Sequence, residues 1–432
     1  MRVERLRLRD FRTYAAADVA VGPGLTVLHG PNGAGKTNML EALYFGCTSR
    51  SCRTTNEREV VRFGAPAARV EVDTLDGDGW AHTLEVGFQP GEPKRLRVDG
   101  APVERLTDSP ARPLVSVFLP DRLELVKGAP AGRRAHLDQL VAALWPARSG
   151  NRAAYSRALA QRNALLARIR AGRVGVDALD AWDAELARWG VALQADRAGA
   201  VQRVAARFPA IASELGLLGE AELKYRPRSK ATDVDCLVEE LRERRTSDLD
   251  RGFSQHGPHR DDLALLRDGR ELRAFGSQGE QRLALLSLLL AERAELADVR
   301  GAAPLMLLDD VMSELDADRR AFLVARLDDG GQALVTTTDL AHVPGGDRAD
   351  VISFTVSPGG TITPDAAPGD AHPAEPPASE VARSDARPAE PPASEVARSD
   401  TRPAEPPASE VAPSDAGFAQ PDASGDAAAE AA

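Results

Sequence analysis

The sequence predicts an α/β fold that is interrupted by a compact helical arm and followed by a disordered tail. Short apolar runs between turn signals fill residues 1–130 and return over 256–362, which is typical of an α/β sheet domain. Residues 131–255 instead have helical periodicity. The tail, residues 363–432, repeats a proline-rich motif with almost no large apolar side chain. We therefore expect one α/β domain whose two halves flank a helical insertion.

An apolar seam predicts the helical arm. Its members are separated by three, four, three and four residues, which places them along one face of a helix. We expect this face to pack against a neighbouring helix. The seam consists of Leu179, Trp182, Leu186, Trp189 and Leu193.

The acidity of the chain is concentrated in the tail. Of the 65 acidic and 54 basic residues, 14 acidic and 4 basic ones lie after residue 363, which leaves 51 acidic and 50 basic residues in 1–363. The tail repeats residues 373–382 from positions 388 and 403, and such a segment buries too little surface to offset the entropy of ordering. It is either a partner tether or an extension without function. The net charge of −11 therefore does not exclude nucleic acid as a partner of the folded part.

Nothing in the sequence predicts a membrane partner. There is no run of about eighteen apolar residues, and residues 1–5 open without the apolar segment of a secretion signal. Cys47, Cys52 and Cys236 lack the spacing of a disulfide framework or a metal site, which suits a reducing compartment. We expect a cytoplasmic, nucleoid-associated protein.

A phosphate-binding loop is the strongest motif of the chain. The string matches G-x-x-x-x-G-K-[ST] at each fixed position, with an apolar strand before it and a helix-forming run after it. Backbone N–H groups of such a loop wrap the phosphates of ATP; Lys36 would reach the β- and γ-phosphates, and Thr37 would ligate Mg²⁺. The residues expected to contact the nucleotide are Gly30, Pro31, Asn32, Gly33, Ala34, Gly35, Lys36, Thr37 and Asn38.

Two carboxylates follow an apolar strand at residues 305–308. A buried parallel strand delivers its C-terminal residues to the ligand crevice of an α/β sheet. Asp309 would then hold Mg²⁺, and Asp310 would orient or deprotonate the attacking water. Two aspartates after a strand usually mark only a turn; the phosphate loop favours the functional interpretation.

A third motif, Ser277-Gln278-Gly279-Glu280-Gln281, precedes a long apolar helix. Ser277 and Glu280 fit a capping box, and a capped helix N-terminus also binds phosphate. The string resembles the signature of ABC-type ATPases, and this resemblance implies that Ser277, Gln278 and Gly279 contact the nucleotide of a second copy. Residues 313–316 stand where the D-loop of that family crosses the dimer interface.

The order of the motifs narrows the resemblance. Residues 131–255 separate the phosphate loop from the signature, as in SMC-like ATPases but on a smaller scale. From residue 1 to about 362 the chain is similar to the bacterial RecF recombination mediators. The strings that carry this resemblance are residues 6–14, 30–38, 161–166, 257–263, 277–282 and 307–316.

The resemblance implies a weak, DNA-stimulated ATPase that forms a homodimer with ATP and binds double-stranded and gapped DNA. It also implies cooperation with RecR and RecO in loading RecA during replication, gap repair and the SOS response. The residues themselves predict a nucleotide switch with catalytic roles for Lys36 and Asp310, and the resemblance implies a catalytic role for Ser277 of the partner copy.

Two other functions are compatible with a phosphate loop. An ATPase subunit of a transporter is disfavoured by the signature string, by the long insertion and by Asp339, where such subunits usually have histidine. A DNA-binding scaffold with a silent nucleotide site is disfavoured because Lys36, Thr37, Asp309 and Asp310 are all present.

Several basic residues have two open interpretations. Arg12 could approach the nucleotide or lie on a solvated strand edge. His259 and Arg260 could contact DNA or a partner, or form a buried structural pair. The clusters Arg133-Arg134 and 242–245 could meet phosphates, although basic helices are more often simply solvated.

Overall fold

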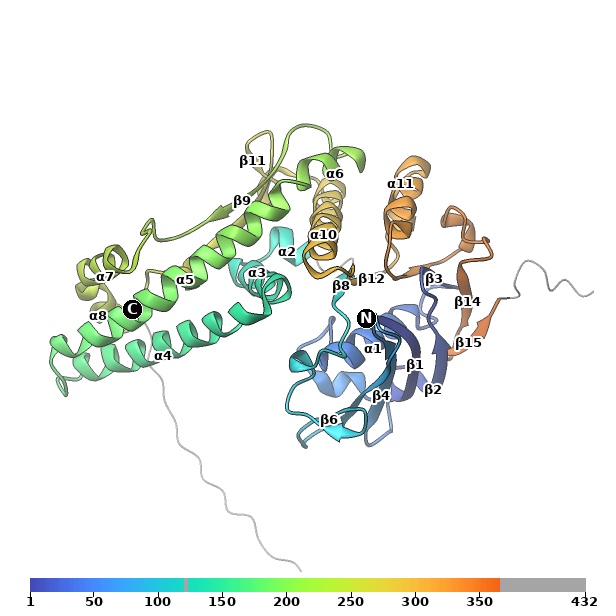
Figure 1. The fold of residues 1–432 in the computed structure, drawn as a ribbon, viewed down its shortest axis with the longest axis horizontal. Helices are drawn as coiled ribbons and strands as arrows, with labels where there is room; N and C mark the ends of the chain where they lie inside the picture. Colours follow the sequence, from blue (N-terminus) through green and yellow to red (C-terminus); the bar gives the residue numbers. More distant parts are fainter. Residues whose placement is uncertain (120–122, 366–432) are drawn as a thin grey trace, which may run out of the picture. The chain divides into compact units, whose positions relative to one another are not determined.

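The computed structural model describes residues 1–119 and 123–365, and Figure 1 shows their helices and strands. At the centre of the α/β part lies a six-stranded sheet in the order β15-β14-β3-β13-β12-β8. All neighbouring strands are parallel except β15, which pairs antiparallel with β14. The strands span Leu25–His29 (β3), Val115–Phe118 (β8), Leu305–Leu308 (β12), Ala333–Thr337 (β13), Ile352–Ser357 (β14) and Thr361–Pro364 (β15).

Both faces of this parallel sheet are covered. Leu305 and Leu307 of β12 belong to the core that contains helix α1 (Lys36–Thr48), whereas Met306 and Leu308 belong to the core that contains α10 (Gln278–Arg300). Because successive side chains of a strand point to opposite faces, burial on both sides requires a continuous apolar run. This requirement explains the sequence Leu-Met-Leu-Leu of β12.

A second, antiparallel sheet packs against α1 in the order β2-β1-β4-β5-β6-β7. Gly46 of α1 allows the close approach, since a Cβ at this position would lie 2.4 Å from Val72 Cγ2. The strands span Arg2–Phe11 (β1), Tyr14–Ala20 (β2), Ala68–Leu75 (β4), Ala81–Phe88 (β5), Arg95–Val98 (β6) and Ala101–Pro102 (β7).

The helical arm contains the predicted seam, and its packing is confirmed. α4 and α5 lie side by side in Figure 1. Leu186 and Leu193 are buried in one cluster with Tyr155 of α4, and Leu179 is buried in another with Leu166. Trp182 and Trp189 are partly buried against these clusters. The arm helices are α3 (Pro130–Leu144), α4 (Gly150–Arg170), α5 (Leu179–Ala205), α6 (Phe208–Glu214), α7 (Val234–Glu243) and α8 (Arg245–Arg251).

One strand interrupts the region that we expected to be helical. β9 (Ala221–Arg226) pairs antiparallel with β10 (Asp262–Arg267), which also pairs with the short β11 (Arg270–Glu271). Ala221 and Leu223 are buried and Tyr225 is half-buried, while Glu222, Lys224 and Arg226 between and after them are exposed. The expectation of helix was wrong here because this short period-two pattern lies among longer helical ones.

The long helix after the signature string and the strand at residues 305–308 are confirmed as α10 and β12. The chain continues through α11 (Ala317–Asp328) to β13. Two further helices of one turn, α2 (Glu124–Lys127) and α9 (Leu272–Phe275), were not predicted. Among residues 1–119 and 123–365, none of the helices combines the length and apolar character that crossing a membrane requires.

The predicted start of the tail at residue 363 was wrong. β15 continues to Pro364, and the next carboxylate, Asp365, lies 2.7 Å from His29 Nε2 and accepts a hydrogen bond of 2.7 Å from Thr355 Oγ1. These contacts tie residues 363–365 to β3 and β14. The remainder of the tail, 366–432, lies outside the described residues.

The buried Gln332 side chain joins the two sheets. Its amide nitrogen donates to Val3 O (2.6 Å) and Gly22 O (2.7 Å), and its carbonyl oxygen accepts from Val3 N at 2.6 Å. We predict that Gln332→Ala lowers the free energy of unfolding by about 2–4 kcal/mol, because it leaves three buried backbone groups unpaired. Urea denaturation measures this loss.

Gln89 provides the control for this prediction. It is exposed and donates only to Glu92, so Gln89→Ala should change the free energy of unfolding by less than about 0.5 kcal/mol. Equal effects of the two substitutions would contradict the role assigned to Gln332.

Candidate active site

The phosphate loop connects β3 to α1 and has a backbone that requires glycine. Gly30, Gly33 and Gly35 have φ angles of 143°, 79° and 114°. A Cβ on Gly30 would lie 2.2 Å from Val356 O, and one on Gly35 would lie 2.9 Å from Thr13 Oγ1. Positive φ and close backbone approach are the two conditions that exclude larger residues. The predicted strand–loop–helix context of this motif is confirmed.

Lys36 lies folded into the loop. Its ammonium donates to the carbonyl oxygens of Gly30 (2.7 Å) and Pro31 (3.0 Å). Burial lowers the pKa of Lys36 below the ordinary lysine value, against the opposing attraction of Asp310 and Asp309. The ammonium of Lys36 is therefore held at a position where it would contact an anion bound by the loop.

The acidic end of β12 meets the start of α1. Thr37 Oγ1 donates to both carboxylate oxygens of Asp309, at 2.9 and 3.0 Å, and Thr336 Oγ1 donates to Asp309 Oδ1 at 2.7 Å. Burial raises the pKa of Asp309, although these two hydroxyls stabilise its ionised form. A hydroxyl and a carboxylate side by side are the hard oxygen ligands that Mg²⁺ takes in addition to phosphate oxygens.

Asp310 occupies a strained position beside this pair. It has φ 47° and ψ 27°, and its backbone N–H donates to Thr336 Oγ1 at 3.0 Å. Its Oδ1 is buried and, among the described residues, has no hydrogen-bond partner. Such atoms are rare in folded proteins and are expected to bind a group that arrives from solution.

Arg12, in the turn between β1 and β2, contacts helix α1. Its guanidinium donates to both oxygens of Glu41, at 2.8 and 2.7 Å, and Glu41 is fully buried. Glu41 also accepts from Ser51 Oγ at 2.5 Å. The interpretation of Arg12 as part of a solvated strand edge was therefore wrong, since only 17% of its side chain is exposed.

Glu41 itself was missed in the sequence. The signal was a single carboxylate among the apolar residues of α1, a pattern that requires a buried partner. Asn38, which we expect near the nucleotide, donates to Thr13 Oγ1 at 3.1 Å. It also accepts from Arg53 at 2.9 Å. These polar contacts tie the start of α1 to the β1–β2 turn and to the segment after α1.

The signature string caps α10, as predicted. Ser277 Oγ accepts from Glu280 N at 3.3 Å, and Glu280 accepts from Ser277 N at 2.8 Å, which completes a capping box. Ser277, Gln278 and Gly279 are exposed. Within residues 1–119 and 123–365, no hydrogen bond or ion pair joins these three residues to the phosphate loop of the same chain. Arg282, one turn further along α10, forms an ion pair of 2.6 Å with Glu314.

Most of the candidate basic clusters are structural. Arg133 is buried and pairs with Asp262 at 2.7 Å, and Arg134 donates to Asp261 O at 2.9 Å. In the cluster 242–245, Arg245 pairs with Asp180 and with the buried Asp183. The charges of Arg133 and Arg245 are neutralised by carboxylates of the same chain, so neither residue offers a free charge to a phosphate, an interpretation that the sequence had left open.

The phosphate loop, the acidic strand end and the capped signature helix around one parallel sheet define an ABC-type ATPase head. An AAA domain model matches residues 5–89. The head of an SMC protein, solved with the C-terminal winged-helix domain of ScpA, has the same fold at a TM-score of 0.52 and 16% identity, over 85% of this chain and 98% of that one.

The comparison with bacterial repair proteins is closer. The DNA replication and repair protein RecF of Anaeromyxobacter sp. is 39% identical over 375 residues, which cover 84% of this chain and 99% of that protein. A solved structure of the recombination mediator RecF with ATP, in the RecFOR pathway, has a TM-score of 0.74 and 26% identity over 84% of this chain and 98% of that one. The chain belongs to the RecF family of DNA replication and repair proteins.

We predict that Gly35→Ala lowers nucleotide affinity at least about tenfold, because a side chain at φ 114° is strained and displaces Thr13 from the loop. Titration with a fluorescent ATP analogue measures the affinity. Gly24→Ala is the control, since a Cβ there meets nothing within 4 Å. Equal affinities of the two variants would show that the loop does not hold the nucleotide.

Proposed function

We propose that this chain is an ATP-dependent, DNA-binding recombination mediator whose two heads join when ATP binds and separate after hydrolysis. The observation that carries this proposal is the contact of Thr37 with Asp309, which unites the phosphate loop and the acidic strand end. Membership of the RecF family and the ATP bound to a solved relative support the choice of nucleotide.

In the proposed site, the loop residues 30–38 hold the phosphates through backbone N–H groups. Lys36 exchanges the carbonyls of Gly30 and Pro31 for oxygens of the β- and γ-phosphates. Thr37 and Asp309 supply the ligands for Mg²⁺, which when bound neutralises charge on those phosphates. A cation held by Thr37 and Asp309 would stabilise the ionised carboxylate and so lower the raised pKa of Asp309.

Asp310 is the proposed general base. Its unpartnered buried oxygen accepts a hydrogen bond from the attacking water and receives the proton as the water oxygen bonds to the γ-phosphorus. The bond from that phosphorus to the bridging oxygen of ADP breaks in the same displacement. Because the site positions one water with one carboxylate, slow hydrolysis that resets a switch is the expected activity.

The second half of each site is proposed to come from the partner copy. Ser277, Gln278 and Gly279 are exposed, and their capping box presents a helix N-terminus. A γ-phosphate held on one head therefore attracts α10 of the other, and hydrolysis removes that attraction. In this way ATP binding is coupled to dimerisation on double-stranded or gapped DNA.

The remaining parts of the proposal follow from the family. RecF relatives are named as DNA replication and repair proteins, and a solved relative as a recombination mediator in the RecFOR pathway. We infer that this chain works with RecR and RecO to load RecA on gapped DNA during replication, repair and SOS induction.

We predict opposite effects of two substitutions in the active site. Lys36→Ala should lower ATP affinity by about ten- to a hundredfold, because it removes a charged hydrogen bond to phosphate. Asp310→Asn should preserve ATP binding and trap the dimer, since only the proton acceptor for hydrolysis is lost. Light scattering at micromolar protein with ATP, Mg²⁺ and DNA measures the dimer. If Asp310→Asn stays monomeric there, the switch mechanism is wrong.

A substitution that preserves the capping box can test whether Ser277 acts only in the structure of its own chain or also in the site of the partner. Ser277→Asp keeps a good N-cap, so the free energy of unfolding should change by less than about 0.5 kcal/mol. A carboxylate beside the partner's γ-phosphate should nevertheless abolish the ATP-dependent dimer, as measured by light scattering. Ser277→Ala is the matched control and should destabilise the chain by about 1 kcal/mol. An unchanged dimer of Ser277→Asp would remove Ser277 from the shared site.

A further inference from the structure

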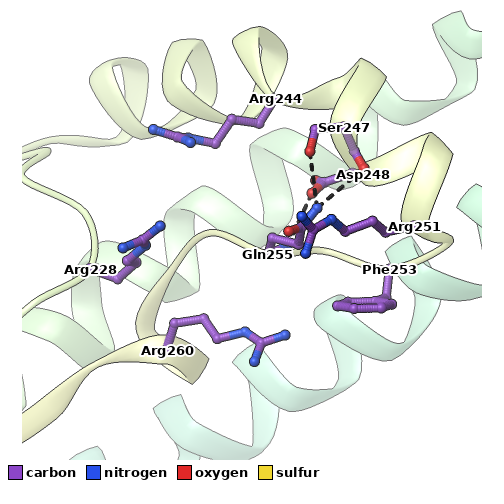
Figure 2. A pocket seen from close by; sticks show the side chains of 8 residues that line it. All are labelled: Arg228, Arg244, Ser247, Asp248, Arg251, Phe253, Gln255 and Arg260. Carbon is purple, nitrogen blue, oxygen red and sulfur yellow. Dashed lines mark hydrogen bonds between the residues drawn. The ribbon is translucent and has the colours of Figure 1, made fainter.

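A basic cavity lies in the helical arm, away from the residues of the phosphate loop. Its volume is about 470 Å³. Figure 2 shows four arginine side chains and one phenylalanine around it. The lining residues are Arg228, Arg244, Ser247, Asp248, Arg251, Phe253, Gln255 and Arg260.

The four arginines of this cavity carry uncompensated charge. In the described part of the chain, no ion pair or hydrogen bond involves their guanidinium groups, and all four residues are exposed. The only carboxylate in the lining, Asp248, is fully buried and already accepts from Arg162 (2.6 Å) and from Gln255 N (3.0 Å). The cavity is therefore electropositive, in contrast to the neighbouring Arg245, which is paired with two aspartates.

A stacking surface borders the same cavity. Phe253 is 41% exposed, and the guanidinium carbon of Arg260 lies 5.7 Å from the centre of its ring. An exposed aromatic ring beside a planar guanidinium is the pairing on which unstacked nucleic-acid bases lie. A carboxylate of an acidic peptide would use the arginines but not the ring.

The loop that carries Phe253 and Arg260 is held rigidly by buried polar contacts. Asn163 Oδ1 accepts from Ser254 N (2.8 Å) and Ser254 Oγ (2.7 Å), and Arg162 donates to Ser254 Oγ at 2.6 Å. Further along, Arg197 donates to Pro258 O at 2.7 Å. A loop anchored in this way presents its outward side chains at fixed positions, which is a requirement of a binding site.

His259 belongs to this support and not to the cavity. Its Nδ1 lies 2.7 Å from Tyr155 OH, and its Nε2 lies 3.0 Å from Ser254 O. Burial lowers the pKa of His259 to about 4, so it is neutral near pH 7 and adds no charge. The structural interpretation is therefore right for His259, whereas Arg260, which we had considered with it, faces the cavity. Residues 161–166 and 257–263 resemble strings of the RecF family to which the sequence assigned no role. Both segments contribute to the contacts that hold this loop.

We infer that this cavity binds one nucleotide unit of a single nucleic-acid strand, with its phosphate among the arginines and its base against Phe253 and Arg260. The volume lies within the range of small-ligand sites, about 300–1,000 Å³, so a base-paired helix cannot enter it. The inference rests on the proposed DNA function for the class of ligand, but its site is separate from the ATP site.

Fluorescence anisotropy with a labelled twelve-nucleotide thymidine strand, without ATP, tests the cavity in the full chain. The double variant Arg251→Ala/Arg260→Ala should lose about ten- to a hundredfold in affinity. Because two arginines are removed, the slope of log affinity against log salt concentration should become shallower by about 1.4. Phe253→Ala should lose at least about fivefold with an unchanged salt dependence, because it removes stacking and no charge.

Arg188→Ala is the matched control. Arg188 is also an exposed arginine beside an aromatic ring, with its guanidinium carbon 5.0 Å from the centre of Trp189, but it does not line the cavity. It should lose less than about twofold. If the double variant loses no more than this control, the inference is wrong. Near-ultraviolet circular dichroism confirms that each variant is folded.

Two competitors decide between ligand classes. If thymidine monophosphate displaces the strand at equal concentration, the ligand is a free nucleotide and the inference of a strand is wrong. If a polyglutamate peptide displaces the strand at equal concentration, the inference of a nucleic-acid ligand is wrong. ATP-dependent dimerisation of the same variants separates the two proposals. Weakened strand binding of the double variant with an intact dimer supports the cavity as a site separate from the switch, whereas unchanged strand binding with an intact dimer contradicts only the cavity. Absence of the dimer in the unmodified chain contradicts only the proposed switch.

Discussion

The carboxylate of Asp309 is the point on which the active site depends. It accepts from Thr37 at the start of α1 and from Thr336 at the end of β13, so the ends of β12 and β13 and the start of α1 meet at one polar centre. A buried charge is tolerated only with such partners. The contact therefore fixes the position of the phosphate loop relative to the acidic strand end, and Lys36 and Asp310 take their places from it.

The arm depends on buried charge in a different way. Arg162 is fully buried between Asp183 and Asp248, and this group holds α4, α5 and α8 together. Removing one member of such a group leaves a charge without compensation, which is far more costly than losing an apolar contact. Some arginines of the arm are therefore engaged in structural ion pairs. Others, such as Arg251, form no ion pair within the part of the chain that the structure describes. Charge on the arm is thus divided between structure and surface.

The sequence predicted most of the head because its motifs obey local rules. The glycines of the loop and the apolar run of β12 require particular backbones, and parallel strands bring their carboxyl ends to one edge. Glu41 could not be assigned in the same way, since its partners Arg12 and Ser51 come from separate segments. The partners of Arg133 and Arg245 are likewise set by tertiary packing. The spacing of residues along the sequence does not reveal ion pairs between distant segments, whereas it does reveal strands and the phosphate loop.

The strand order of the parallel sheet has a consequence for synthesis. β3 emerges early from the ribosome, yet its two neighbours, β13 and β14, are made about 300 residues later. Until they appear, the apolar residues of β3 lack both neighbouring strands, and pairing across so long a separation is slow. The nascent chain therefore carries a phosphate loop long before it has the Asp309 carboxylate. Any stabilisation by a nucleotide that depends on the contact of the loop with Asp309 can therefore begin only after Asp309 has been made.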